Sequence, residues 1–150
     1  MYFYEKTMPF TYEFPRPAVT VDIIIFRLAN DQPEVLLIER GNEPYKGQWA
    51  LPGGFVNKDE PLETAAAREL EEETGLKDIL LTQMHTFGSP GRDPRGHTVS
   101  VVYVGYLPDG MLAVAGDDAA DTAWFKLDQL PPMAFDHGMV VEMAEEIFLV

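Results

Sequence analysis

The sequence predicts an α/β protein in which a mixed β-sheet lies between helical layers. Strand-like runs of β-branched residues alternate with two helical stretches along the chain, an interleaving typical of a sheet covered by helices. The 150 residues, 46% of them hydrophobic, amount to one ordinary domain with a real core. The absence of cysteine excludes a disulfide scaffold, a Cys-ligated zinc site and a thiol nucleophile.

An extended arm is predicted over residues 1–17, ahead of a domain over residues 18–150. Proline at positions 9, 15 and 17 excludes a helix in the arm, because proline and the residue before it both resist helical geometry. The arm also carries aromatic side chains at positions 2, 3, 4, 10, 12 and 14, which would be costly to expose. We therefore expect it to pack on its own domain or on a second subunit.

The first elements of the domain are predicted to be two strands, over residues 18–27 and 34–39, joined as a hairpin by turn-forming residues. A loop rich in glycine and proline follows over residues 41–54. Further strand-like segments are predicted at residues 79–84, 98–106 and 122–127. The last helix is predicted to be amphipathic, with an apolar side made of Met139, Val140, Met143, Ile147 and Phe148.

A helix is predicted between the loop and the third strand, from about Pro61 to Thr74. Pro61 suits the first helical position, Glu60 precedes it as a cap, and Gly75 stands where a left-handed residue ends a helix. Its apolar stripe consists of Leu62, Ala65, Ala66 and Leu70.

Acidic residues of this helix face the predicted core. Glu69 and Glu73 fall within the apolar stripe and Glu72 at its edge, whereas Arg68 is predicted to point outward. Carboxylates one turn apart on such a stripe repel each other and lose hydration. We expect no basic neighbour except Lys77 to neutralise them, so Mg²⁺ or Mn²⁺ is the natural counter-ion. A solvated acidic helix face is the alternative.

Charge restricts the partners of the protein. The chain has 11 Lys and Arg against 25 Asp and Glu, a net charge of -14, which repels nucleic acids and anionic lipid surfaces. No apolar stretch approaches the roughly 20 residues that span a bilayer, and the N-terminus lacks the features of a signal peptide. We expect a cytoplasmic protein with no nucleic-acid or membrane partner. A small anionic substrate remains compatible, provided that a divalent metal and local arginines reverse the field in one cleft.

The loop and the acidic helix together resemble the Nudix box. Gly54, Glu60 and the run Arg68-Glu-Leu-Glu-Glu-Glu-Thr-Gly-Leu76 match all nine fixed positions of that 23-residue pattern. The sequence thus resembles the Nudix hydrolases, which cleave nucleoside diphosphates linked to another moiety. This resemblance implies an α/β/α sandwich and a divalent metal.

The same resemblance implies roles for residues of the box. Arg68 would orient the acids through a charge-assisted hydrogen bond, and Glu60 would tie the loop to the helix. The implied metal ligands are Glu69, Glu72, Glu73 and the backbone carbonyl of Gly53, which glycine geometry would expose. For Gly53 and Gly54 a simple tight turn is the alternative.

A second segment, residues 89–98, resembles a loop of microbial ADP-ribose pyrophosphatases, as do residues 134–137. Pro90 lies 15 residues past Gly75, where those enzymes often carry proline. The resemblance implies hydrolysis of ADP-ribose to AMP and ribose 5-phosphate. The alternatives are another nucleoside diphosphate derivative, an oxidised nucleoside triphosphate, or a catalytically silent nucleotide-sensing domain.

Arginines of this segment are candidates for binding the pyrophosphate, because guanidinium groups bind phosphate in a bidentate way. The alternative for Arg92 and Arg95 is local pairing with Asp93. Two histidines nearby, His97 and His137, are expected to form structural hydrogen bonds rather than act as bases. The full set of candidate substrate-binding residues is Arg40, Arg92, Arg95 and Phe135.

The general base is assigned to the loop before the last strand. Asp118 resembles an acid that many Nudix proteins carry there as a metal ligand or as a base, with Asp117 as the alternative residue and plain turn chemistry as the alternative reading. The candidate catalytic residues are therefore Arg68, Glu72, Glu73 and Asp118. Adenine would stack on aromatic residues of the arm or on Phe135, with ordinary core packing as the alternative role of each of these residues. Similar enzymes form homodimers, so we expect a homodimer in which the arm helps to line the site.

Overall fold

A hairpin forms the centre of the fold. β1 (Ala18–Ala29) and β2 (Gln32–Glu39) pair antiparallel, with Ala29 opposite Gln32. The two residues between them, Asn30 and Asp31, have φ values of 53° and 63°, which a two-residue hairpin turn requires. The predicted hairpin is confirmed.

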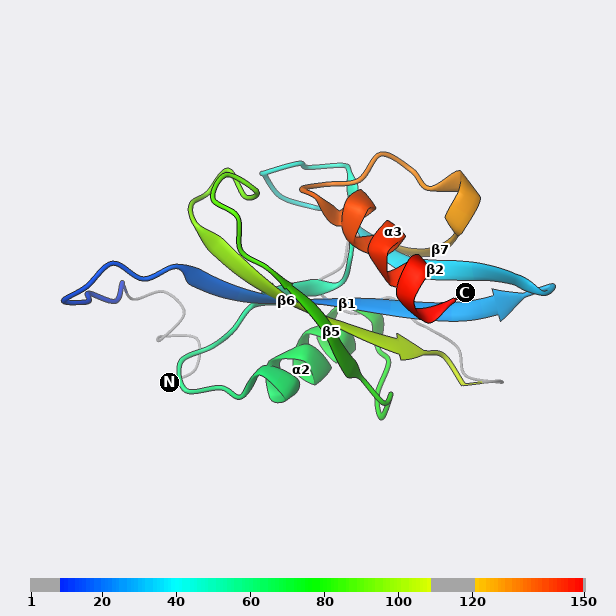
Figure 1. The fold of residues 1–150 in the computed structure, drawn as a ribbon, viewed down its shortest axis with the longest axis horizontal. Coiled ribbons are helices and arrows are strands. Elements are labelled where there is room, and N and C mark those ends of the chain that lie inside the picture. The colour runs from blue at the N-terminus through cyan, green and yellow to red at the C-terminus, as the bar shows by residue number, and fades with distance from the viewer. Residues whose placement is uncertain (1–8, 109–120, 150) are drawn as a thin grey trace.

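The structure is a computed structural model that describes residues 9–108 and 121–149 (Figure 1).

One mixed sheet contains the strands of the described residues, in the order β3-β2-β1-β6-β5, with β4 pairing with β1 and β7 with β2. β1 and β6 run parallel, and the other pairs run antiparallel. β5 begins three residues later than predicted, whereas β6 has the predicted bounds. The remaining strands are β3 (Trp49–Ala50), β4 (Gly53–Phe55), β5 (Thr82–Phe87), β6 (Thr98–Tyr106) and β7 (Asp121–Lys126).

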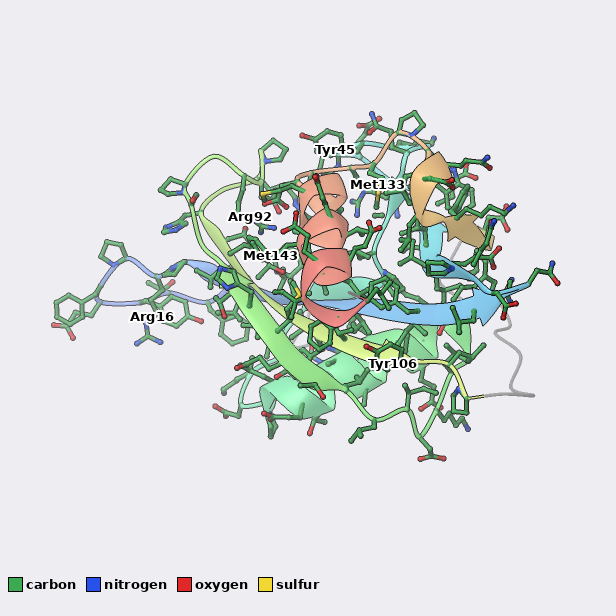
Figure 2. The ribbon with its side chains drawn as sticks, turned by 45° about the vertical axis from the view of Figure 1, so that its right-hand side comes forward. Arg16, Tyr45, Arg92, Tyr106, Met133 and Met143 are labelled. Atoms are coloured by element: carbon green, nitrogen blue, oxygen red, sulfur yellow. The ribbon has the colours of Figure 1, made fainter. Side chains whose placement is uncertain are left out.

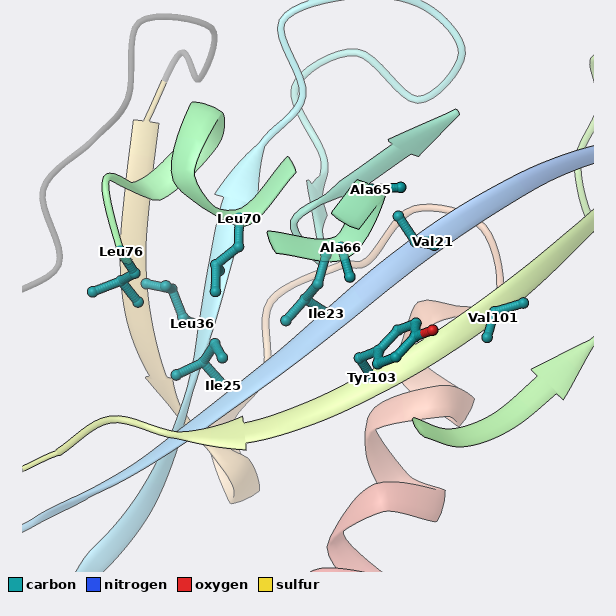
Figure 3. Close-up of a cluster of buried hydrophobic side chains, with 10 residues drawn as sticks. All are labelled: Val21, Ile23, Ile25, Leu36, Ala65, Ala66, Leu70, Leu76, Val101 and Tyr103. Atoms are coloured by element: carbon teal, nitrogen blue, oxygen red, sulfur yellow. The ribbon is translucent and has the colours of Figure 1, made fainter. Parts of the chain in front are cut away.

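Helices cover both faces of this sheet. α2 (Leu62–Thr74) lies on one face and α3 (His137–Phe148) on the other, as Figure 1 shows, and a short 3₁₀ helix, η1 (Leu127–Gln129), follows β7. Alternate residues of β1 point to opposite faces. Val21 and Ile23 join the core under α2 (Figure 3), and Ile24 joins the core under α3. The predicted α/β/α sandwich is confirmed.

The ends of α2 agree only in part with the prediction. Gly75 ends the helix in the left-handed conformation at φ 76°, as expected. The N-cap position is occupied by Pro61 without a side-chain cap, so the predicted capping role of Glu60 is wrong. The Glu60 carboxylate instead accepts a hydrogen bond from the Asn57 N–H at 3.0 Å.

α3 buries a stripe that agrees only in part with the predicted one. Val140 and Phe148 pack in the core as predicted, whereas Met139 and Ile147 are 49% and 58% exposed. The buried positions are spaced by three, four and seven residues from the first residue of the helix, which is the period of one helical face. They are His137, Val140, Val141 and Ala144.

The described part of the arm, residues 9–17, is extended and exposed. Phe10, Tyr12 and Phe14 are 49%, 51% and 67% exposed, and Arg16 stacks on the Tyr12 ring at 4.2 Å (Figure 2). Phe10 and Tyr12 nevertheless line a pocket together with residues 55–59 of the domain. Packing of the arm on a second subunit stays a prediction. Among the described residues, no helix is long and apolar enough to cross a membrane.

Candidate active site

α2 presents its acids to β4 at very short range. The Gly53 N–H donates a hydrogen bond to Glu73 Oε2 at 3.2 Å. A Cβ atom added to Gly54 would lie 2.6 Å from Glu69 Oε1, closer than any side chain tolerates. The glycine pair is therefore needed for the close approach of strand and helix, and not only for a turn.

Burial crowds these carboxylates together, as the helical wheel predicts. Glu69 is only 8% exposed, and Glu72 lies at the more open edge of the face. Burial first, and then the charges of Glu69, Asp22 and Glu72, together raise the pKa of Glu73 to about 9 against the lowering effect of the Gly53 hydrogen bond. The site concentrates negative charge that its own hydrogen bonds do not fully compensate.

Arg68 faces the acids, so its predicted outward position is wrong. Its Nη1 donates to Glu69 Oε1 at 2.7 Å and to Glu72 Oε2 at 3.2 Å, while its Nε donates to Glu60 Oε2 at 2.8 Å. These contacts, led by the Glu60 hydrogen bond, raise the pKa of Arg68. The long side chain folds back across the helix, which a wheel of Cα positions does not capture. The expectation that only Lys77 lies near the acids is wrong for the same reason.

The donor set suits a hard divalent cation, but the side chains do not form a finished cage. No three acidic or histidine side chains of the described residues lie close enough to enclose a metal ion as they stand. Glu69 and Glu72 accept hydrogen bonds from Arg68, and Glu73 accepts one from Gly53. Carboxylate oxygens are nevertheless the ligands that Mg²⁺ and Mn²⁺ prefer. The carboxylates of Glu69 and Glu72 crowd around the single guanidinium of Arg68, which leaves negative charge that such an ion would neutralise.

A pocket opens beside Glu73 and collects arginines from distant segments. Arg40, Arg92 and Arg95 line it together with Gly53 and Phe135. Burial and the nearby Arg95 lower the pKa of Arg40, because like charges resist each other. In this pocket of a protein with net charge -14, three guanidinium groups stand beside three carboxylates, those of Asp22, Glu73 and Asp93. The arginines give an anion local partners, and the carboxylates give a cation its own.

Arg95 is held rigidly in this pocket. Its Nε and Nη2 donate to the two oxygens of Asp93 at 3.0 and 2.8 Å, which lowers the pKa of that carboxyl. Its guanidinium stacks between the rings of Phe55 and Phe135, 4.8 and 5.4 Å from their centroids. Arg40 stacks on the same Phe135 ring at 5.0 Å. Local pairing with Asp93 thus fixes Arg95 within the pocket instead of removing it.

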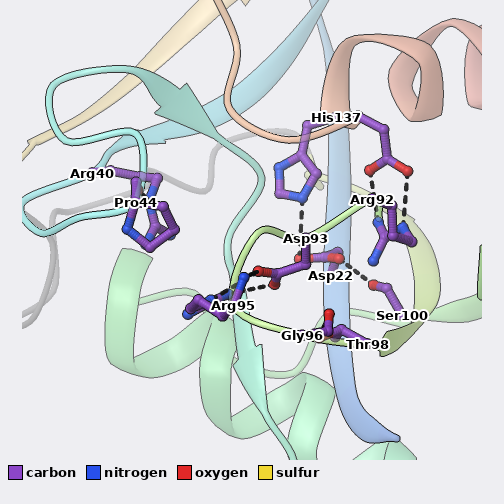
Figure 4. Close-up of polar contacts among 11 residues, drawn as sticks. Asp22, Arg40, Pro44, Arg92, Asp93, Arg95, Gly96, Thr98, Ser100 and His137 are labelled. Carbon is purple, nitrogen blue, oxygen red and sulfur yellow. Dashed lines mark hydrogen bonds and ion pairs between the residues drawn. The ribbon is translucent and has the colours of Figure 1, made fainter. Parts of the chain in front are cut away.

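Arg92 does not pair with Asp93. It forms a two-pronged pair with Asp136, Nη2 to Oδ1 at 2.6 Å and Nε to Oδ2 at 2.9 Å (Figure 4). The Arg92 side chain is only 8% exposed. This pair ties the arginine loop to the start of α3, near which Figure 2 places Arg92.

Both histidines near the site form hydrogen bonds, as expected. His137 Nδ1 accepts the Leu51 N–H at 3.0 Å, and burial lowers the pKa of its imidazole. His97 Nε2 lies 2.8 Å from the carbonyl oxygen of Gly88. The Nδ1 atom of His137 is therefore occupied, and the Nε2 atom of His97 is the donor of its contact.

Two residues of the pocket do not follow from the sequence reasoning. Asp22 is a buried acid in the middle of an apolar strand, and that misplaced charge is the signal that would have found it. Phe55 is 44% exposed at the end of β4, directly after the glycine pair. The predicted base Asp118 and its alternative Asp117 lie outside the described residues.

Inward acids on a helix that face a pocket of arginines, on an α/β/α sandwich, define a protein that handles small anionic ligands. The family model described as NUDIX domain matches residues 16–143. The chain belongs to this family and is a Nudix pyrophosphohydrolase.

Two relatives match most of this chain. An ADP-ribose pyrophosphatase of Methanocaldococcus jannaschii is 45% identical over 126 residues, 84% of this chain and 72% of that protein. An ADPR responsive transcriptional repressor NtrR of Acinetobacter baylyi is 37% identical over 136 residues. That match covers 88% of this chain but only 54% of the repressor, so the chain spans about half of its length.

Two solved structures share the fold at similar identity. The NUDIX domain of Shewanella oneidensis NrtR, complexed with ADP ribose, superposes with a TM-score of 0.79 at 34% identity, over 89% of this chain and 90% of that one. A bifunctional NMN adenylyltransferase/ADP ribose pyrophosphatase of Francisella tularensis, complexed with AMP and a Mn ion, superposes with a TM-score of 0.74 at 33% identity. The latter match covers 91% of this chain and 43% of that one. Divalent metal is the general requirement of Nudix hydrolases.

Proposed function

We propose that this protein is a Mg²⁺-dependent hydrolase of ADP-ribose that releases AMP and ribose 5-phosphate, with Mn²⁺ as an alternative metal. The observation that carries the proposal is the pocket that both Glu73 of α2 and Arg95 of the loop after β5 line. A diphosphate between them would meet the acids' cation on one side and guanidinium groups on the other.

Each group of residues has its own part in the proposal. Glu69, Glu72, Glu73 and the Gly53 carbonyl would hold the cation, which when bound lowers the pKa of water and neutralises phosphate charge. Arg68 would keep two of these carboxylates in place through the hydrogen bonds described above. Asp118 would accept the proton of the attacking water.

The arginines would act on the diphosphate itself. Arg40, Arg92 and Arg95 would bind its oxygens and stabilise the negative charge that grows during attack. Water adds to one phosphorus in line with the bridging oxygen, a new P–O bond forms and the bridging P–O bond breaks. One water is consumed, and AMP and ribose 5-phosphate leave.

The relatives support ADP-ribose over other substrates. Proteins named for this compound, or complexed with it, match most of this chain at 34–45% identity. A nucleotide panel tests the choice: ADP-ribose, other nucleoside diphosphate sugars and an oxidised nucleoside triphosphate, compared by kcat/KM with Mg²⁺. ADP-ribose should lead by at least tenfold. A higher kcat/KM for another nucleotide of the panel would show that this nucleotide, and not ADP-ribose, is the preferred substrate.

A nucleotide-sensing domain is the second candidate, and the A. baylyi repressor is the observation that favours it. Such a domain would bind ADP-ribose without turning it over. Calorimetric titration together with product analysis distinguishes the two functions. Tight binding with no AMP formed at any Mg²⁺ concentration would select the sensor.

A homodimer completes the proposal, because the described arm leaves its aromatic rings exposed. The arm of one subunit would cover the partner and help to stack adenine, with Phe135 as the other stacking candidate. Light scattering in solution should give about twice the mass of the chain, and a monomer at all concentrations would remove this part. The cytoplasmic location and the absence of nucleic-acid and membrane partners stay predictions from the charge.

A further inference from the structure

Three polar side chains form a buried chain beneath the candidate active site. Ser100 of β6 is fully buried, and Asp22 of β1 and His137 of α3 are 8% and 5% exposed (Figure 4). The Ser100 hydroxyl donates a hydrogen bond to Asp22 Oδ2. On the other side, His137 Nε2 lies 3.7 Å from Asp22 Oδ1. The chain therefore runs from one strand of the sheet to the first residue of the helix that covers it.

The hydrogen bonds fix which nitrogen of His137 carries the proton. Its Nδ1 accepts the Leu51 N–H at 3.0 Å, so in the neutral ring the proton is on Nε2, facing Asp22. A neutral imidazole orients the Asp22 carboxylate without cancelling its charge. None of the ion pairs among the described residues joins Asp22 to a Lys or Arg, although the charge of Arg40 acts on it from farther away. Asp22 is thus a buried carboxylate with no cation in direct contact, an arrangement that costs stability.

Asp22 stands directly across Gly53 from Glu73. The register of β1 and β4 places Asp22 opposite Gly53, and a Cβ atom on Gly53 would lie 2.5 Å from Asp22 Oδ1. The N–H of the same glycine donates to Glu73 Oε2. One glycine therefore separates the Asp22 carboxylate from the acids of α2, and both Asp22 and Glu73 line the pocket.

We infer that Asp22 is a further positioning residue of the hydrolytic site, one that lies outside the acidic helix. Its charge strengthens the binding of the divalent cation held by α2, and through His137 it holds the Leu51–Gly53 segment in place. Burial of the Asp22 charge lowers the stability of the metal-free protein. We infer that Asp22 is retained in spite of this cost because its charge strengthens cation binding. This inference rests on the proposed function, since it presupposes a cation beside Glu73.

Asp22→Asn is the variant that tests the inference, because it removes the charge, keeps the shape and can still accept the Ser100 hydrogen bond. Mn²⁺ binding to the full chain is followed by the electron paramagnetic resonance signal of the free ion. The Kd for Mn²⁺ should rise about tenfold or more. The melting temperature of the metal-free protein should rise by about 3 °C, because an uncompensated charge is gone. Glu146→Gln, which changes the net charge equally from an exposed site on α3, should alter neither.

The outcomes separate the two proposals. A wild-type chain that binds no Mn²⁺ contradicts the proposed function itself. A wild-type chain that binds Mn²⁺ and an Asp22→Asn variant of equal affinity overturn only the role of Asp22. A variant that melts earlier than wild type or fails to fold also overturns that role, because a purely structural contact would then explain any weaker binding.

Discussion

Arg92 and Asp136, 44 residues apart in the chain, form a partly buried two-pronged ion pair of 2.6 and 2.9 Å. The pair joins two segments that the sequence analysis places in the same subgroup of enzymes, 89–98 and 134–137. The pair gives the two segments a shared structural role: segment 89–98 carries the arginines, and Asp136 of segment 134–137 holds Arg92 against the start of α3.

The Arg92–Asp136 pair should contribute measurably to stability. Arg92→Ala leaves the Asp136 carboxylate partly buried without its partner, so the free energy of unfolding should fall by about 3 kcal/mol. Lys77→Ala is the control, because the Lys77–Glu71 pair is exposed, and it should cost about 0.5 kcal/mol or less. Urea unfolding measures both values. Equal small losses would show that the Arg92 pair is not a structural anchor.

Arg95 should affect binding of the substrate phosphates. Arg95→Ala removes a stacked guanidinium from the pocket, and kcat/KM for ADP-ribose should fall roughly 10- to 100-fold, the cost of a lost charge-assisted hydrogen bond. Arg95→Lys should recover only part of this loss, because lysine lacks the planar fork. Steady-state kinetics give the answer. Full activity of Arg95→Ala would place the diphosphate elsewhere.

Gly54 should tolerate no side chain. The Cβ atom of Gly54→Ala would meet the Glu69 carboxylate at 2.6 Å and push it away from the site, so turnover should fall at least 100-fold. Gly138→Ala is the matched control, since a Cβ atom there has no neighbour within 4 Å. It should keep full turnover and gain about 0.5 kcal/mol of stability. Comparable turnover in the two variants would mean that the Gly54–Glu69 contact is not required.

His137 should make stability depend on pH on the acid side. Its pKa is lowered by burial, so below the unfolded value of about 6.5 the unfolded chain binds a proton that the folded chain does not. The contribution of this group to stability is therefore present above pH 6.5 and is lost as the pH falls from there.

His137→Gln keeps an acceptor for the Leu51 N–H and removes the titrating ring. The loss of unfolding free energy between pH 7 and pH 5 should be smaller in this variant than in wild type, as measured by urea unfolding. His85→Gln replaces an exposed histidine and should keep the wild-type slope. Identical slopes for wild type and His137→Gln would contradict burial of a neutral imidazole.

Local patterns in the sequence predicted the elements that depend on neighbours in the chain. The hairpin of β1 and β2 follows from strand-like runs around Asn30 and Asp31, and the end of α2 follows from Gly75. The inward position of Glu69 follows from the period of the helix. These features depend only on local backbone geometry and on the periodic spacing of apolar residues, and both can be inferred from the sequence.

Features that depend on distant segments could not be predicted. Arg92 pairs with Asp136, which lies directly before α3. Asp22 is buried because Ser100 of β6 and His137 of α3 pack against it. Arg68 was misplaced because its side chain bends back to Glu60 and Glu69, which its position on the helix does not reveal. Long side chains and tertiary pairs decide these contacts.

Turnover of ADP-ribose with Mg²⁺ present, chelated and restored tests the central claim most directly, with AMP and ribose 5-phosphate quantified by chromatography. The wild-type chain should form both products only while Mg²⁺ is present. Glu72→Gln and Glu73→Gln should stay folded and lose activity by about 100-fold or more, while Glu71→Gln, an exposed neighbour on α2, should keep it. Turnover that persists without metal, or survives in Glu73→Gln, would contradict the account.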